Sequence, residues 1–199
     1  MWKFVMGKPT TTKCYDMEES DIKNIKKELR AAMNGILSAK MREAGAPYKL
    51  VFGVELPRLQ SIAAEFQPSR TLAQQLWNEN IRECKLLATM LMPPQEFLPE
   101  MADIWADEIP TAEVAQILCM QLLCKEPWCA VTAFEWIAST SPMRQLCGFL
   151  CIARLLQQGA KLQERSIKEL QDQAQSLLPN AELPLRKAIM AATSFLSEK

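Results

Sequence analysis

Residues 76–88 have the sequence Leu-Trp-Asn-Glu-Asn-Ile-Arg-Glu-Cys-Lys-Leu-Leu-Ala, in which apolar segments flank a polar turn at 78–80. Apolar residues recur at helical spacing on both sides of this turn, so the stretch predicts two helices joined by a short loop. Helices joined by short loops pack as antiparallel neighbours. The rest of the chain repeats this pattern of amphipathic helix and breaker.

The first helix is predicted to be long. Asp21 is its expected N-cap, Ile25, Met33 and Ile36 belong to its apolar face, and the Gly-Ala-Pro stretch at 45–47 ends it. Further helices are predicted at 57–66, 69–77, 81–92, 95–108, 111–125, 127–138, 142–158, 163–178 and 182–197. No segment shows the period-two alternation that is typical of a half-buried strand.

This pattern predicts an all-α fold of about ten helices, paired at a period of about 30–40 residues, as in a HEAT- or armadillo-like α-α superhelix. The repeats show no strict sequence identity, so an irregular helical bundle is the alternative. We expect residues 1–15, which are basic and Thr-rich, to form a loose leader, and residues 16–199 to form a single helical repeat domain.

Charge is balanced at 23 basic and 23 acidic residues, which excludes a strong global attraction to nucleic acid. Basic residues prevail in 1–50 and acidic residues in 101–160, so any anion-binding face is a local patch. The seven cysteines lack the dense spacing of a secreted scaffold and predict reduced thiols in a cytoplasmic protein. No apolar run approaches the ~20 residues that span a bilayer, so no membrane association is expected.

The absence of histidine excludes Ser-His-Asp and Cys-His catalysis and histidine-dependent metal sites. No glycine-rich phosphate loop is present, and we expect neither cofactor nor metal. The cysteines at 119, 124, 129, 147 and 151 lie in apolar helical runs and are interpreted as core residues. The acidic pair Asp103 and Asp107 is interpreted as a solvated helix face.

Trp105, Trp128 and Trp136 have π faces that can cover a base or a cation, although packing between helices is their commoner role. Arg144 lies at the start of a strongly apolar helix, where the helix dipole disfavours a cation. It is therefore interpreted either as a phosphate ligand or as a structural ion pair with Glu113 or Glu135.

Several short motifs, in the same order along residues 28–198, resemble the DNA alkylation repair family of HEAT-like-repeat alkylpurine DNA glycosylases (the AlkD family). These motifs are Phe52-Gly53-Val54 with Pro57-Arg58, Leu76-Trp77 with Arg82-Glu83 and Ala88, Met143-Arg144-Gln145-Leu146 with Phe149, and Arg186-Lys187-Ala188-Ile189. The resemblance implies a repeat protein that binds duplex DNA in a concave basic groove and releases cationic alkylated purines by cleaving the N-glycosidic bond.

The positions that carry the family's chemistry hold other residues. The family's Trp-x3-Asp pair falls on Thr111 and Ala115, and its C-terminal tryptophan falls on Ala191, so only Arg144 matches. Glu113 lies two residues from the expected acid and points to another side of the helix. The sequence therefore predicts a DNA-binding protein with little or no glycosylase activity and with no identified catalytic residue.

We expect a local basic patch to contact DNA, formed by Arg144, Arg186, Lys187, Lys23 and Lys27. There are two alternatives. The chain is an active glycosylase with an altered set of residues, Glu113 or Asp107 with Trp105 or Trp136, or it is a protein-interaction scaffold that has lost DNA binding.

Overall fold

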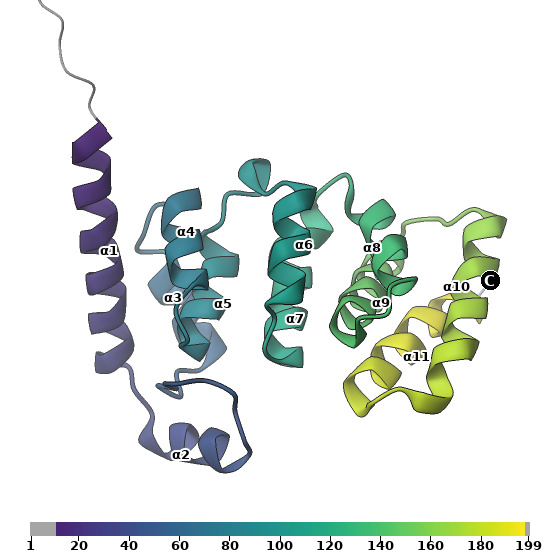
Figure 1. Ribbon diagram of the computed structural model, residues 1–199, viewed down its shortest axis with the longest axis horizontal. Helices are drawn as coiled ribbons and strands as arrows, with labels where there is room; N and C mark the ends of the chain where they lie inside the picture. Colours follow the sequence, from purple (N-terminus) through teal and green to yellow (C-terminus); the bar gives the residue numbers. More distant parts are fainter. Residues whose placement is uncertain (1–10, 198–199) are drawn as a thin grey trace, which may run out of the picture. The chain divides into compact units, whose positions relative to one another are not determined.

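Eleven α-helices and three short 3-10 turns make up the secondary structure of residues 11–197, which are the residues that the computed structural model describes (Figure 1). No strand occurs in this part of the chain, and Leu50 and Ile81 form an isolated bridge. The all-α prediction is confirmed. None of the described helices is long and apolar enough to cross a membrane.

The chain divides into two compact units, residues 1–91 and 92–199, and each is described separately. Unit 1 contains α1 (Thr11–Ala31), α2 (Gly35–Glu43), α3 (Leu56–Ala63), α4 (Arg70–Trp77) and α5 (Arg82–Leu91). Unit 2 contains η1 (Pro94–Glu96), α6 (Pro99–Asp107), α7 (Ala112–Gln121), η2 (Leu123–Lys125), α8 (Cys129–Ile137), α9 (Pro142–Gln157), α10 (Glu164–Leu177), η3 (Leu178–Asn180) and α11 (Leu183–Ser197).

The prediction of one long first helix is wrong. Residues 32–34 divide it into α1 and α2, because Asn34 takes an extended conformation and its Oδ1 accepts a hydrogen bond from Leu37 N at 3.1 Å, which caps α2. Met33 and Ile36, expected on the apolar face, are exposed. Helix α1 begins at Thr11, so Asp21 lies inside it and residues 11–15 of the expected leader are helical. Residues 1–10 lie outside the described residues.

Serine side chains cap the first turns of two other helices. Ser69 Oγ accepts from Leu72 N at 3.4 Å and begins α4, and Ser141 Oγ accepts from Arg144 N at 3.4 Å and begins α9. Pro142 follows Ser141 at the first helical position, where a missing N–H is tolerated. These local signals explain why α4 and α9 lie within one or two residues of their predicted bounds.

A buried carboxylate joins α5 to segment 51–54 in unit 1. Glu83, fully buried at the start of α5, accepts hydrogen bonds from the backbone N–H groups of Phe52, Gly53 and Val54 at 3.0, 2.9 and 3.3 Å. Arg82 Nη1 donates to Glu83 Oε1 at 3.0 Å and to Val54 O at 3.0 Å. The carboxylate thus fixes the irregular segment 51–54, since buried backbone N–H groups need a partner.

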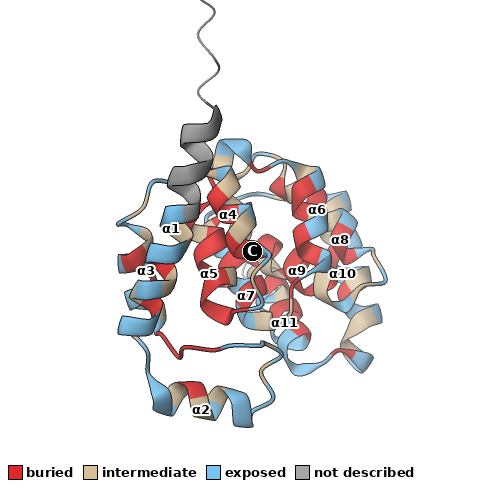
Figure 2. Cartoon of the chain, turned by 60° about the vertical axis from the view of Figure 1, so that its left-hand side comes forward, coloured by how far each residue is buried: buried red, intermediate tan, exposed pale blue. Residues whose placement is uncertain are grey.

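The apolar core of unit 2 is built around α9, which contacts α6, α7, α8 and α11. Buried residues line the inward sides of these helices, whereas α2 in unit 1 is mostly exposed (Figure 2). Gly148 permits α8 to approach α9 closely, because a Cβ at this position would lie 2.6 Å from Ala133 O and 2.7 Å from Ile137 Cγ1. Trp136 on α8 and Phe149 on α9 are both buried in this core.

Candidate functional site

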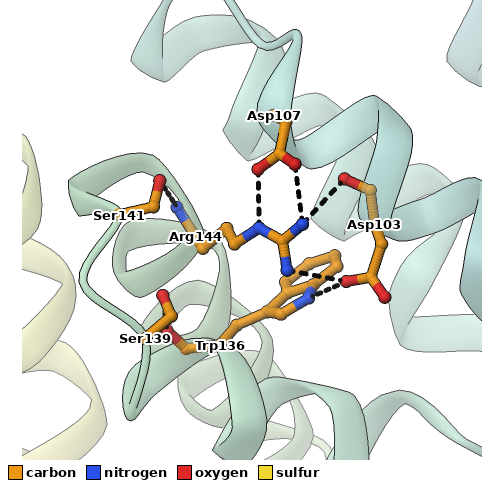
Figure 3. A network of polar contacts seen from close by, with 6 residues as sticks. All are labelled: Asp103, Asp107, Trp136, Ser139, Ser141 and Arg144. Atoms are coloured by element: carbon orange, nitrogen blue, oxygen red, sulfur yellow. Dashed lines mark hydrogen bonds and ion pairs between the residues drawn. The ribbon is translucent and has the colours of Figure 1, made fainter.

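Arg144 is the centre of a polar network between α6 and α9 (Figure 3). Its Nε and Nη2 donate to the two carboxylate oxygens of Asp107 at 2.6 and 2.7 Å, a bidentate pairing. Its Nη1 donates to Asp103 Oδ1 at 3.0 Å, and Nη2 also donates to Asp103 O at 3.4 Å. Four of the five N–H donors of the guanidinium are therefore directed at α6.

Trp136 completes this network from α8. Its indole Nε1 donates to Asp103 Oδ1 at 2.7 Å, so this carboxylate oxygen binds Arg144 and Trp136 together. The Trp136 ring is buried, and only the N–H edge takes part in the polar contacts. A buried indole N–H needs an acceptor, and Asp103 supplies it.

The electrostatics of the network are those of a tight ion pair. The hydrogen bond from Arg144 lowers the pKa of Asp107, and the same bond raises the pKa of Arg144. Arg144 is 24% exposed, while Asp103 and Asp107 are 47% and 57% exposed. One guanidinium and two carboxylates give a local charge of −1, so this site does not attract a phosphate as it stands.

Two sequence interpretations are corrected here. The expected ion pair of Arg144 with Glu113 or Glu135 is wrong, because the partners are Asp103 and Asp107. The acidic pair was interpreted as a solvated helix face, and both side chains are indeed accessible, but both bind Arg144. The sequence could not show this, since the partners are 41 and 37 residues away along the chain.

The three positions onto which the sequence resemblance maps the family's catalytic groups hold a helix cap, a buried alanine and an exposed alanine. Thr111 caps α7, its Oγ1 accepting from Val114 N at 3.5 Å. Ala115 is fully buried in α7, and Ala191 is exposed on α11. None of these three side chains offers a carboxylate or an aromatic face.

The tryptophans of unit 2 make packing contacts. Trp105 is buried and meets Phe97 edge-on, with ring centroids 5.1 Å apart. Trp128 is half-buried, with its ring centroid 6.2 Å from that of Phe97. Together with the buried Trp136, these rings are packing residues, the commoner of the two roles expected for them.

The remaining candidate DNA contacts are exposed. Lys23 and Lys27 lie one turn apart on α1 in unit 1, and Lys26 between them is paired with Glu79 at 2.6 Å. Arg186 and Lys187 are adjacent on the first turns of α11 in unit 2, and Arg186 Nη2 donates to Ala181 O at 3.2 Å. The structure thus shows two basic pairs, and it places Arg144 among carboxylates.

A cleft of about 590 Å³ lies at the start of α11, and Leu185, the residue before Arg186, is part of its lining. The first turns of α7, α9 and α11 and the end of α10 line it, with Thr111, Pro142, Gln145, Ser176 and Leu185 among its residues. Three helix N-termini, the positive ends of helix dipoles, therefore surround one cavity. Sequence reasoning missed this cleft, because its lining comes from four helices that are brought together only by packing.

Comparison with known proteins identifies the relatives of this chain. The family model described as DNA alkylation repair enzyme matches residues 25–193. The chain belongs to the DNA alkylation repair enzyme family. A comparison with curated proteins finds no match.

One solved structure has a fold similar to that of this chain. It belongs to a protein described as one of a new family related to the HEAT-like repeat DNA glycosylases, with affinity for branched DNA structures. The TM-score is 0.77 at 18% sequence identity, and the match covers 88% of this chain and 75% of that chain. The predicted HEAT-like fold and the predicted family are both confirmed.

Proposed function

We propose that this protein binds DNA through local basic pairs and carries out little or no base excision. The proposal rests on the mapping of the family's catalytic positions onto Thr111, Ala115 and Ala191, of which Thr111 is a helix cap, Ala115 is buried and Ala191 is exposed. A glycosylase needs groups that stabilise positive charge as the glycosidic bond breaks, and removing such groups costs several kcal/mol each.

DNA binding is supported by two features of unit 2. Arg186 and Lys187 are exposed and directly follow Leu185, which lines the cleft, and the N-termini of three helices line the same cleft. Backbone N–H groups at helix starts and basic side chains are the usual ligands of DNA phosphates. The structural neighbour is described as having affinity for branched DNA structures, so binding should be measured with both linear and branched DNA.

Arg144 remains a proposed phosphate ligand, but only by exchange with its carboxylate partners. A phosphate that displaces Asp107 keeps the bidentate geometry that this side chain offers. Neutralising that competitor with Asp107→Asn should then strengthen DNA binding, while Arg144→Gln should weaken it. If Arg144 has only a structural role, both variants should bind DNA with the affinity of the wild type.

The test measures binding and base release on one preparation. Fluorescence anisotropy follows the full chain with an undamaged duplex, with a duplex that carries a cationic methylpurine, and with a four-way junction, each titrated in salt. We expect salt-sensitive binding and no released base. Replacing both Arg186 and Lys187 by Gln should reduce the salt slope by about 0.9 for each DNA phosphate that the variant no longer neutralises.

The same double substitution at Lys23 and Lys27 tests the pair on α1. Lys161→Gln is the matched control, since it removes an exposed positive charge elsewhere in unit 2. Release of the methylated base would contradict the proposal and support an altered glycosylase that uses Asp107 or Glu113. Absence of binding to all three DNA forms would support a protein-interaction scaffold.

We also propose that the protein works in a reducing compartment such as the cytoplasm. The six cysteines in the described side chains, at 84, 119, 124, 129, 147 and 151, are all free thiols. This state persists where the redox poise keeps thiols reduced. Its direct test is the location of the tagged protein in fractionated cells, where recovery from an oxidising compartment would contradict the proposal.

A further inference from the structure

Three cysteines from different elements of unit 2 converge. Cys124 lies in η2, Cys129 is the first residue of α8, and Cys151 lies in the second half of α9. Their Sγ atoms are all within 4.8 Å of one another. Cys129 and Cys151 are buried, and Cys124 is half-buried, so the cluster is accessible from its Cys124 side.

The spacing of the three sulfurs suits a metal–thiolate site. A metal–sulfur bond of about 2.3 Å places two ligating sulfurs about 3.8 Å apart in tetrahedral geometry and about 4.0 Å apart in trigonal geometry. The observed upper limit of 4.8 Å is closed by side-chain shifts of well under 1 Å at each sulfur. Cysteine sulfur selects soft ions, with zinc the common divalent case.

The charges around the cluster favour a divalent ion. Arg154 lies three residues after Cys151 on α9, hence on the same side of the helix, and its charge lowers the pKa of Cys124 further after the hydrogen bonds from Cys129 and Cys151. Arg154 Nε is buried and lacks a hydrogen-bond partner among the described residues. Three thiolates, one divalent ion and this guanidinium sum to zero charge, which a buried site requires.

A metal ion that binds this cluster must displace thiol protons. Cys124 Sγ donates to Cys151 O at 3.9 Å, so its proton is directed at the backbone of α9. An ion that binds the three sulfurs releases their protons to the solvent, and the sulfurs bind it as thiolates.

We propose that Cys124, Cys129 and Cys151 form a binding site for one soft divalent metal ion of the zinc class, with the fourth coordination position facing the accessible Cys124 side. This proposal replaces the expectation that these thiols are only core residues. The proposal is independent of DNA binding. A bound ion would cross-link η2, α8 and α9 through its three sulfur ligands. Cys119, whose Sγ is 3.6 Å from Cys147 O, borders the cluster without belonging to the triad.

The test uses cadmium as the probe, because its thiolate complexes absorb in the near ultraviolet. The full chain, reduced with a phosphine, is titrated with Cd²⁺, and Zn²⁺ is then added as competitor. We expect one Cd²⁺ per chain with thiolate charge-transfer absorbance, displaced by Zn²⁺. We also expect a rise in the thermal unfolding midpoint, because the ion binds the assembled site of the folded chain more tightly than it binds the unfolded chain.

Single serine variants decide which thiols are ligands. Loss of a group that merely supports a metal ligand costs about 10–100-fold in affinity, so Cys124→Ser, Cys129→Ser and Cys151→Ser should each cost at least about 100-fold. Cys84→Ser is the matched control, a buried cysteine of unit 1 that should leave binding unchanged. Cys124 is the most accessible of the three, so its variant disturbs the core least.

Two outcomes would overturn the proposal. The first is a wild-type titration with no charge-transfer absorbance. The second is a Cys124→Ser variant that has wild-type helical circular dichroism and retains wild-type Cd²⁺ affinity. If the variant does not fold, thermal unfolding of the wild type is the deciding measurement. An unfolding midpoint that neither Cd²⁺ nor Zn²⁺ changes would contradict the site.

Discussion

Replacing Glu83 by Ala should be among the most destabilising single changes in unit 1. The Glu83 carboxylate accepts hydrogen bonds from three backbone N–H groups and from the buried Arg82 guanidinium. Alanine leaves a buried positive charge without its carboxylate, which costs about 3–5 kcal/mol. The total stability of a small domain is about 5–15 kcal/mol, so this substitution removes a large part of it.

The assay is unfolding in urea, which gives the free energy of unfolding and its denaturant slope. Unfolding is followed by the loss of the far-ultraviolet circular dichroism of the helices. Glu79→Ala is the matched control, since Glu79 precedes the same helix and pairs with Lys26 at the surface, where an ion pair contributes about 0–1 kcal/mol. Glu83→Gln should fall between the two, because it keeps one acceptor oxygen without the charge. If Glu83→Ala stays within about 1 kcal/mol of the wild type at an unchanged denaturant slope, the carboxylate does not hold segment 51–54.

Other substitutions test unit 2, with Gly35 of unit 1 as a control. Gly148→Ala should destabilise by about 1–3 kcal/mol in thermal unfolding, since its Cβ meets Ala133 O at 2.6 Å, whereas Gly35→Ala, with nothing within 4 Å, should be neutral or stabilising. Trp136→Phe removes the hydrogen bond to Asp103 and should cost about 1–2 kcal/mol, and an unchanged midpoint would contradict the role given to this indole. Because Arg144 lowers the pKa of Asp107 below 3.8, its contribution to stability is present above that pH and is lost as pH falls through the lower folded value. The stability difference between the wild type and Asp107→Asn should therefore shrink below pH 3.8, and a difference that is independent of pH would refute the ion pair.

Local patterns predicted most helices well. Periodic apolar residues with a Ser cap determine α4 and α9, and those signals act within one turn. The break at 32–34 was missed because apolar periodicity continues across it in the sequence. There Asn34 N donates to Phe52 O at 3.0 Å, so a hydrogen bond to a distant segment helps to end the first helix.

The polar sites depended on packing that the sequence does not display. Arg144 was identified as important, but its partners follow from how α6 lies against α9. Cys124 and Cys129 are five residues apart in sequence, and a continuous helix would point them in different directions. The chain instead turns through η2 before α8 begins, and packing against α9 brings both thiols to Cys151, which no spacing rule shows.

The hydrogen bonds from segment 51–54 to Glu83 also change the expected rate of amide hydrogen exchange in this segment. Irregular segments usually exchange their amide hydrogens quickly, through small local openings. The amides of Phe52, Gly53 and Val54 have a buried side chain as their acceptor and open only when α5 separates from them. They should therefore exchange as slowly as the central amides of α5, which makes this loop one of the most rigid parts of the backbone in unit 1.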